Sequence, residues 1–417
     1  MTNCEKLDAW IDAHFDEETR FLQALVQVST DTPPGDNAPH AERAAELLAG
    51  MGLVAEKHAV PAADVQAAGM QSITNLIVRR RFGNLNGGGP TIALNAHGDV
   101  VPPGEGWTHG PYSGAVVDGK LYGRAAAVSK SDFASYTFAL RAVESLEGSA
   151  AVGAKLQGCV ELHFTYDEEF GGELGPGWLL QQGLTRPDLL IAAGFSYQVV
   201  TAHNGCLQLK VTLHGQASHA AYPDTGVDAL QAATKLLTAL YAHNTVLRTR
   251  LSQVTGITHP YLNVGRIEGG SNTNVVPGRV VLKIDRRMIP EENAAAVETE
   301  VRALIESTVA QSPGILLDIK RLLLAQPLRP LPGSEALVAT IQEHGLVVFG
   351  EPIAESGSPL YTDVRLYGAH GVPAVIYGAG PRTVLQSNAK RADEHVVLSD
   401  LRGATKVIAR TLLDLLT

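Results

Sequence analysis

Residues 94–132 of this chain are LNAHGDVVPPGEGWTHGPYSGAVVDGKLYGRAAAVSKSD. The apolar segment 91–97 predicts a buried strand, and the apolar residues of 131–146 predict a helix, so the stretch links a strand to a helix through a long loop. His97 and Asp99 lie two residues apart at the strand end, where side chains face the same way. Asp99 is therefore placed to orient the His97 ring toward a metal ion, although such pairs are often purely structural.

The same alternation of strands and helices continues along the chain. Segments 158–169 and 188–197 predict buried strands, and 174–183 predicts a short helix between them. This pattern predicts a mainly parallel sheet with helices on both faces, in which active sites gather at the carboxyl ends of the strands. Glu168 and Glu169 end one strand. One of them can ligate a metal while its neighbour acts as a general base, and the alternative is a solvated turn.

From about residue 206 the pattern changes to strand, helix, two strands, helix, strand, which is the order of a two-layer ferredoxin-like α+β unit. Its elements fall, in order, at 206–216, 226–244, 261–270, 279–288, 292–308 and 314–326. After about residue 325 the α/β pattern returns. We therefore predict an α/β catalytic domain of residues 1–205 and 325–417, with an inserted domain of residues 206–324.

Length and charge set the broad class. The 417 residues are enough for two domains, and the net charge of −10 argues against a nucleic-acid partner. Residues 1–21 lack the basic start and apolar core of a signal peptide, and no apolar run reaches the roughly 18 residues that span a membrane. Three cysteines do not make a disulfide framework. We expect a cytoplasmic protein with no membrane partner.

Several motifs occur in the order that is typical of one family of metallopeptidases. They are HGDVVPPGEGWTHGPYSG (97–114), DGKLYGR (118–124), TYDEEFGG (165–172), GQASHAAYPDTGVDAL (215–230), GGSNTNVVPG (269–278), KIDRR (283–287) and YTDVRLYGAHGVPAVIYGAG (361–380). The chain resembles, over nearly its whole length, the family that contains aminoacylase, acetylornithine deacetylase, succinyl-diaminopimelate desuccinylase and carboxypeptidase G. The resemblance implies a catalytic α/β domain plus a lid domain that commonly dimerises.

The resemblance also implies roles for the first-domain residues. His97 and Glu169 would be metal ligands, Asp99 would orient His97, and Glu168 would be the general base.

In the lid domain, the resemblance implies that Arg287 grips the carboxylate of a small anionic substrate, and a planar guanidinium suits that task. A lone Arg at a strand end is otherwise usually a surface charge. His219 and Asn274 would complete an active site, often that of a partner subunit. We therefore expect a homo-oligomer, at least a dimer through the lid domain. The sequence leaves open whether the lid completes the site in cis or in trans.

The chain departs from the family pattern at other metal-ligand positions. The family's two metal ions share a bridging Asp in the motif GRGxxDxKG, where this chain has Val128 in GRAAAVSKSD. A carboxylate normally follows the next strand, where this chain offers Ala192, Ala193 and Gly194. A last His ligand is expected where this chain has Lys390. A two-metal site of the family type therefore cannot be assembled from these residues.

We predict instead one divalent transition metal, Mn²⁺, Co²⁺ or Zn²⁺, bound weakly by His97 and Glu169. Another polar side chain or the substrate itself would supply further ligands, and in the latter case metal and substrate bind cooperatively. The side-chain candidates are Ser129, Asp132 and Asn388, and the cations expected beside the acids are Arg124, Lys130 and Lys390.

These features predict a metal-dependent hydrolase of a C–N bond in a small substrate that carries a carboxylate. The resemblance further indicates hydrolytic deamination of an aromatic amine, with 5-nitroanthranilate giving 5-nitrosalicylate and ammonia. Tyr112, Phe195 and Tyr197 are candidates to stack on such a ring, although residues of this kind more often belong to the core. The alternatives are an amidohydrolase of the aminoacylase or dipeptidase type, and a metal-free relative without catalysis.

Overall fold

The computed structural model describes residues 1–83, 88–147 and 155–417. These residues form two compact units. The first unit consists of Met1–Thr201, Pro330–Ser356 and Thr362–Thr417, and the second of Ala202–Arg329 with Gly357–Tyr361.

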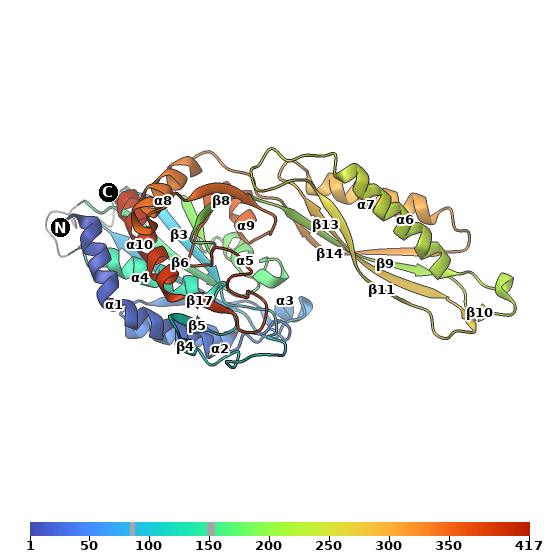
Figure 1. The fold of residues 1–417 in the computed structure, drawn as a ribbon, viewed down its shortest axis with the longest axis horizontal. Helices are drawn as coiled ribbons and strands as arrows, with labels where there is room; N and C mark the ends of the chain where they lie inside the picture. Colours follow the sequence, from blue (N-terminus) through green and yellow to red (C-terminus); the bar gives the residue numbers. More distant parts are fainter. Residues whose placement is uncertain (84–87, 148–154) are drawn as a thin grey trace. The chain divides into compact units, whose positions relative to one another are not determined.

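A large sheet forms the centre of the first unit (Figure 1). Within the described residues its strand order is β1-β2-β6-β3-β7-β16-β8-β15. The bounds are β1 (Ala55–Ala59), β2 (Thr74–Phe82), β3 (Thr91–His97), β6 (Gly158–Thr165), β7 (Leu189–Ala192), β8 (Gln198–His203), β15 (Ala354–Ser358) and β16 (Ala374–Ile376). The neighbours β6, β3, β7 and β16 are parallel, whereas β1, β2 and β8 pair in the antiparallel sense. The predicted parallel sheet is therefore confirmed at its centre, with antiparallel strands on both sides.

Helices cover both faces of this sheet. They are α1 (Asn3–Val26), α2 (Ala38–Gly50), α3 (Ala62–Ala67), α4 (Lys130–Glu144), α5 (Pro176–Gln181), α8 (Ser334–Phe349), α9 (Val364–Ala369) and α10 (Leu398–Leu416). Phe164 of β6 stacks on Phe133 of α4, with ring centroids 3.9 Å apart. His163, the next residue of β6, bonds instead to the hydroxyl of Tyr367 in α9 at 2.8 Å. Because neighbouring strand residues point to opposite faces, α4 and α9 lie on opposite sides of the sheet, as the sequence predicts.

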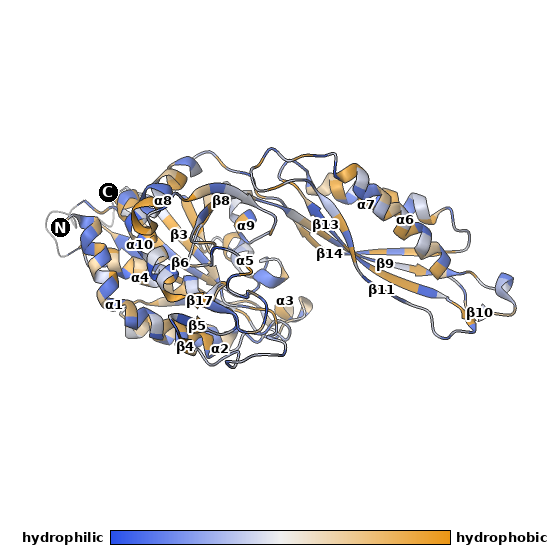
Figure 2. Ribbon diagram, viewed as in Figure 1, coloured by the Kyte–Doolittle hydropathy of each residue, from blue (hydrophilic) through white to orange (hydrophobic). Residues whose placement is uncertain are grey.

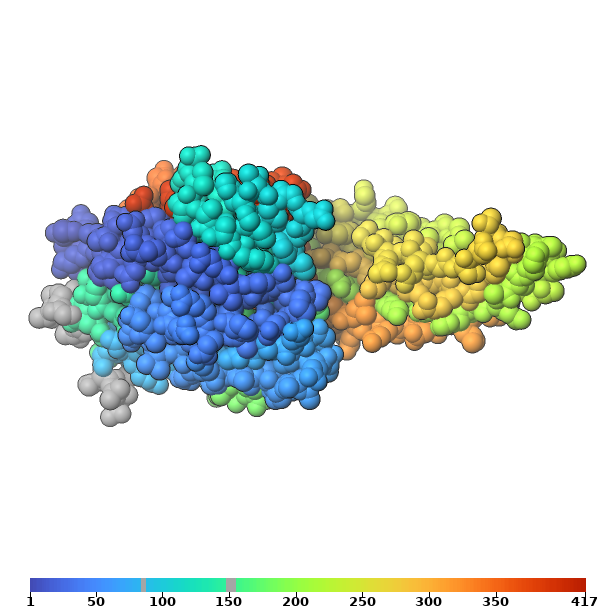
Figure 3. Space-filling model, turned by 90° about the horizontal axis from the view of Figure 1, so that it is seen from below, coloured from blue at the N-terminus to red at the C-terminus, as the bar shows by residue number. Residues whose placement is uncertain are grey.

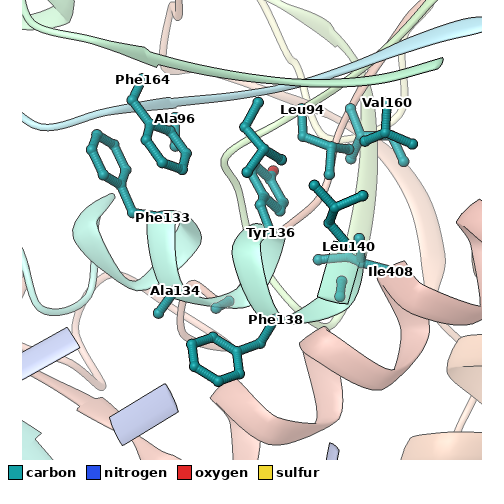
Figure 4. Packing of buried hydrophobic residues seen from close by; sticks show 14 of the residues in the cluster. Leu94, Ala96, Phe133, Ala134, Tyr136, Phe138, Leu140, Val160, Phe164 and Ile408 are labelled. Atoms are coloured by element: carbon teal, nitrogen blue, oxygen red, sulfur yellow. The ribbon is translucent and has the colours of Figure 1, made fainter. Parts of the chain in front are cut away.

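The core beneath α4 shows why this segment is helical. Phe133, Tyr136 and Leu140 follow helical spacing and point at β3 and β6 (Figure 4). They meet Leu94, Ala96, Val160 and Phe164, and Ile408 of α10 closes the cluster. The apolar colouring of β3 and β6 in Figure 2 matches their burial on both faces. This packing fixes the strand ends that carry the candidate site.

Glu18 of α1 is a carboxyl buried in the same core region. It accepts a hydrogen bond from Thr405 of α10 at 2.6 Å, and its other oxygen has no partner within the described residues. Burial raises the pKa of Glu18 to about 8, against the opposing effects of Thr405 and Arg402. The folded protein therefore binds this proton more tightly than the unfolded chain, in which the ordinary value of 4.5 applies.

We predict that Glu18→Gln flattens the pH dependence of stability. The stabilisation from protonated Glu18 is complete below about pH 4.5 and is lost as the pH rises through about 8. Over that window the free energy of unfolding of the wild-type protein should fall by up to about 1.4 kcal/mol per pH unit, and that of the variant should not show this fall. Thermal midpoints measured across the window check this. Glu17→Gln, which alters a surface ion pair with Arg141, is the control, and parallel curves for wild type and Glu18→Gln would contradict the prediction.

The second unit has the predicted ferredoxin-like order. Its elements are β9 (Gly205–His214), α6 (Ala229–Leu247), β11 (Tyr261–Gly269), β13 (Arg279–Met288), α7 (Ala294–Val309) and β14 (Leu316–Ala325). The strands form an antiparallel sheet in the order β11-β13-β9-β14, and α6 and α7 pack against its strands. None of the helices in the described ranges is long and apolar enough to cross a membrane.

Candidate active site at the carboxyl ends of the parallel strands

The pairing of β3 with β6 brings the first candidate residues together. The two strands are parallel, and His97, the last residue of β3, lies opposite Thr165, the last residue of β6. The chain then turns into a short 3₁₀ helix, η1 (Glu168–Phe170). Nε2 of His97 lies 3.8 Å from Oε2 of Glu168. The structure therefore places His97, Glu168 and Glu169 at one edge of the sheet, as the sequence predicts.

Asp99 connects the two strand ends. Its carboxylate is fully buried and accepts backbone hydrogen bonds from Glu168 at 3.2 Å and Glu169 at 3.0 Å. The Nδ1 atom of His97 lies 3.0 Å from the backbone oxygen of Asp99 and 3.4 Å from its carboxylate. Asp99 thus contacts the His97 ring, most closely through its backbone oxygen, and also fixes the backbone of the acidic turn. Sequence reasoning missed this second task, because a carboxylate-to-backbone contact leaves no mark in residue spacing.

The segment before α4 holds the backbone of His97 by hydrogen bonds. Ser129 is buried and its hydroxyl bonds to both the backbone nitrogen of His97 at 2.9 Å and its oxygen at 3.0 Å. Asp132 accepts from the backbone nitrogen of Ala379 at 2.7 Å. These two proposed extra ligands are therefore already used in supporting the site. Val128 differs from its buried neighbours, since this residue is 38% exposed.

The electrostatics of the cluster favour a cation next to His97. Burial alone would lower the pKa of His97, but the carboxylates of Glu168, Asp99 and Glu169 outweigh it and raise that pKa to about 10. The negative charge that stabilises an imidazolium also stabilises a metal ion in its place. Burial, with the nearby Glu169 carboxylate, raises the pKa of Glu168 to about 7, although His97 and Lys390 oppose this. A carboxylate with such a pKa is suited to exchange protons at neutral pH.

One pair of side chains in the cluster lies close enough to share a metal ion. Two ligands of one ion, each at about 2.0–2.2 Å, lie within about 4.4 Å of each other. The separation of 3.8 Å between His97 and Glu168 satisfies this limit and is too long for a direct hydrogen bond, but the resemblance makes Glu168 the general base and Glu169 the ligand. Within the described residues no group of three or more His, Cys, Asp or Glu side chains is placed to hold an ion. Further ligands for an ion at His97 would have to come from outside this set.

Two of the positions that depart from the family pattern offer no metal ligand. One has no room for a larger side chain, and the other carries a lysine in place of a histidine. A Cβ atom at Gly194 would lie 2.4 Å from Cγ2 of Ile376, so a larger side chain does not fit there. Lys390 places its ammonium 2.7 Å from Oε2 of Glu169.

A buried ion pair links the two loops that carry Val128 and Lys390. Arg124 donates to Glu394 at 2.6 Å, and both side chains are almost fully buried. Glu394 also accepts from the backbone nitrogens of Ala127 and Lys390. Sequence analysis expected Arg124 beside the acids and overlooked Glu394. The structure gives Arg124 a loop-fixing contact instead.

The other expected contributors have different partners. Lys130 is buried and donates to the backbone oxygen of Val28 at 2.8 Å, and burial lowers its pKa to about 7. Tyr112 donates a hydrogen bond to Asp31. Tyr197 donates to Asp400 at 2.8 Å. Of the three cations expected beside the acids, Lys390 is thus the one that forms an ion pair with a predicted ligand.

The long loop between β3 and α4 lies on the surface of the first unit. Gln23 of α1 donates to the backbone oxygen of Gly114 in this loop at 2.9 Å. Figure 3 shows the loop in turquoise beside the blue N-terminal helices. Near its end the loop turns inward, since Leu121 and Ala126 are fully buried in the core of the first unit.

In the second unit, the candidate residues fall into two groups. Strands β10 (Ser218–His219) and β12 (Val275–Val276) pair, and the backbone nitrogen of Ala220 donates to the oxygen of Asn274 at 2.9 Å. This brings His219 and Asn274 together. In the pairing of β13 with β9, Arg287 lies opposite Cys206 at the start of β9, whereas Arg279 lies opposite His214 at the end of β9. His219 follows that far end, and the intervening strand is about 27 Å long, so one copy of this unit does not bring Arg287 to His219.

Arg287 is held at its own end of the sheet. Its Nε atom donates to Asp285 at 2.7 Å, and its guanidinium lies over the ring of Tyr361, 5.6 Å from the centroid. The guanidinium is therefore fixed by neighbours within the second unit.

Comparisons with known proteins agree with this architecture. Residues 201–313 match the family model described as a peptidase dimerisation domain. The succinyl-diaminopimelate desuccinylase of Gluconacetobacter diazotrophicus is 26% identical over 340 residues, which cover 79% of this chain and 82% of that protein. The desuccinylase of Acidiphilium cryptum is 28% identical over a match that covers 82% of this chain and 86% of that protein.

Solved structures share the fold. A metallo-carboxypeptidase of the M20 family from Sulfolobus solfataricus superposes with a TM-score of 0.76 at 18% identity, over 95% of this chain and 98% of that one. The Bacillus subtilis YXEP protein, described as a dinuclear metal-binding peptidase of the M20 family, gives a TM-score of 0.67 at 15% identity, over 97% and 99% of the two chains.

Proposed function

We propose that this chain, which belongs to the M20 family of metallopeptidases and amidohydrolases, hydrolyses a C–N bond in a small substrate that carries a carboxylate. The observation that supports this best is the position of Glu168. Its carboxylate faces the imidazole of His97 at 3.8 Å and its pKa is raised to about 7. A carboxylate in that state accepts a proton from water and later returns it to a leaving amine.

Each residue of the first unit has a proposed task. His97 and Glu169 hold one divalent ion, Mn²⁺, Co²⁺ or Zn²⁺. When bound, the ion supplies Lewis-acid polarisation of the bond under attack and favours ionisation of water. Glu168 accepts the water proton at its carboxylate, and Asp99 keeps both the His97 ring and the Glu168 backbone in place. The small set of protein ligands implies weak metal binding.

As the specific reaction we propose hydrolytic deamination of an aromatic amine, 5-nitroanthranilate to 5-nitrosalicylate. The oxygen of water bonds to the ring carbon while Glu168 takes one proton. The nitro group para to the amine accepts the negative charge of the adduct. The C–N bond then breaks, Glu168 returns its proton to the nitrogen, and ammonia leaves. The absence of the two-metal donor set supports an unusual, ring-shaped substrate over a peptide. The exposed apolar Val128, next to the Ser129 that bonds to the His97 backbone, supports it as well.

The test is ammonia release from 5-nitroanthranilate by the purified protein with added Mn²⁺, compared with a chelated control. We expect metal-dependent ammonia and an equal amount of 5-nitrosalicylate. If a folded protein releases none, amide substrates of the kind named for its relatives, such as N-succinyl-diaminopimelate and dipeptides, become the better candidates. No turnover of either class would favour the metal-free alternative.

A further inference from the structure

Arg287 is held in the second unit by one edge of its guanidinium. Its Nε atom donates to Oδ1 of Asp285 at 2.7 Å, and its Nη2 atom lies at a longer 3.4 Å from Oδ2. Its Nη1 atom makes no hydrogen bond to the described residues, and the side chain is 22% exposed. A guanidinium has five N–H donors in a planar fork. The contact with Asp285 therefore leaves the donors at the Nη1 end unused.

The Asp285 carboxylate is in turn fixed by strand β9. The pairing of β13 with β9 places Gln208 opposite Asp285 and Cys206 opposite Arg287. The Nε2 atom of Gln208 donates to Oδ2 of Asp285 at 3.0 Å, and the Sγ atom of Cys206 lies 3.4 Å from the same oxygen. Burial, with the nearby Asp285 carboxylate, raises the pKa of the Cys206 thiol to about 12, so the thiol stays protonated and donates. Two neighbouring strands thus set the direction in which Asp285 holds Arg287.

The unused donors of Arg287 lie in the plane of its guanidinium. The ring of Tyr361 lies over one face of this group, 5.6 Å from the guanidinium carbon to the ring centroid. Asp285 takes the Nε edge, so the donors that remain are those of the Nη1 and Nη2 end. A carboxylate has two oxygens in one plane and accepts two parallel N–H bonds from such an end.

The charge of Asp285 also changes which anions these donors favour. Arg287 and Asp285 together have no net charge, so the attraction that a lone guanidinium exerts on every anion is largely cancelled. Asp285 repels a dianion twice as strongly as a monoanion. Directional hydrogen bonds then decide binding, and they favour a planar monocarboxylate. A group that repels the wrong ligand is a common source of specificity.

We propose that Asp285 is a positioning residue that aims Arg287 end-on at a carboxylate and makes this subsite select a planar monocarboxylate over a dianion. Gln208 and Cys206 support Asp285 in this task. The inference rests on the proposed function, because it takes a carboxylate as part of the substrate and Arg287 as the group that binds it. It concerns the second unit alone and involves neither a metal ion nor turnover. A failure of the ammonia assay therefore leaves its test intact.

The first arm of the test compares two anions on the full, chelator-treated chain. Benzoate, a planar monocarboxylate, and sulfate, a dianion, are titrated by calorimetry into wild type, Asp285→Asn and Asp318→Asn at one salt concentration. Asp285→Asn should lower the ratio of benzoate affinity to sulfate affinity about tenfold or more. Sulfate gains more than benzoate from the loss of the negative charge, and benzoate also loses the aimed fork. Asp318 lies on β14 of the same sheet and makes no ion pair with the described residues, so Asp318→Asn should keep the ratio within about twofold.

The second arm separates the charge of Asp285 from its position. Asp285→Glu keeps the charge but moves the carboxylate, so it should weaken benzoate binding about threefold or more and leave sulfate binding within about twofold. Gln208→Leu removes one support of Asp285 and should lower the ratio in the same direction, by less than Asp285→Asn does. Arg287→Met should abolish the benzoate binding.

A merely structural role of Asp285 would weaken the binding of both anions together and leave their ratio unchanged. An unchanged ratio in Asp285→Asn, or an equal change in Asp318→Asn, would overturn the proposal. So would a wild-type chain that binds no benzoate, or benzoate binding that Arg287→Met does not weaken. If Asp285→Asn does not fold, Asp285→Glu and Gln208→Leu decide the question by the same ratio.

Discussion

Glu168→Gln should lower kcat by about 10²–10⁴-fold and leave KM for the substrate almost unchanged. The amide keeps the size of the carboxyl group and the backbone contact with Asp99 at 3.2 Å. It cannot take a proton from water or return one to the leaving nitrogen. Because Glu168 is only partly exposed and its pKa is already raised to about 7, replacing it by a neutral group should not destabilise the fold. Steady-state kinetics on the substrate identified by the ammonia or amide assay, with a thermal melt, measure both effects.

The matched control for this variant is Glu173→Gln. Glu173 lies on the same turn and pairs with Arg365 at 3.2 Å, but its side chain is 66% exposed. It should retain kcat within about twofold, since exposed pairs contribute little. A Glu168→Gln enzyme with wild-type kcat would remove the general base from the mechanism. If the wild type and the Glu168→Gln variant both bind the substrate and neither turns it over, the result would favour the metal-free relative without catalysis.

The fold follows from local patterns to a large extent. Helical spacing at Phe133, Tyr136 and Leu140, and the uniformly apolar strands at 91–97 and 158–165, carry enough information to predict a helix over a parallel sheet. The ferredoxin-like order of the second unit also follows from its succession of elements. The antiparallel pairing of β1 and β2 with this sheet did not follow, because strand direction is decided by connections and not by residue type.

The site was predictable where strand ends position it, and not elsewhere. His97, Glu168 and Glu169 follow apolar strands, and parallel pairing brings such ends together. The contact between Lys390 and Glu169 joins residues 221 positions apart, and the Arg124–Glu394 pair joins residues 270 positions apart. No local pattern contains either pair. The resemblance identified Lys390 as a departure from the family, and only the structure shows which group it contacts.

The roles of the second-unit residues remain predictions, and their geometry makes one of them testable. His219 and Asn274 lie together beyond one end of the sheet, and Arg287 lies at the other end, about 27 Å along β13. If all of them serve catalysis, a single copy cannot direct both ends of this sheet at one small substrate. The match of residues 201–313 to a dimerisation domain supports a second copy as the source of His219 and Asn274.

We therefore predict that two inactive variants restore activity when their subunits are exchanged. His219→Ala should lose about 10²-fold or more in kcat, and Glu168→Gln is inactive for the reason given above. In a re-paired equal mixture about half of the dimers are mixed, and one of their two sites combines an intact Glu168 with an intact His219 from the other copy. The mixture should recover about a quarter of the wild-type rate. Activity measured after mild dissociation and re-pairing checks this.

The control mixture is Glu168→Gln with Glu169→Gln. Both changes lie on the same turn of the first unit, so every site in a mixed dimer carries one of them and no activity should return. Asn274→Ala should behave as His219→Ala does, because the backbone holds these two residues side by side. If mixing His219→Ala with Glu168→Gln restores nothing although subunit exchange is verified, His219 acts within its own chain or not at all. In that case the separation of His219 from Arg287 along β13 means that Arg287 of the same copy does not serve the site that His219 serves.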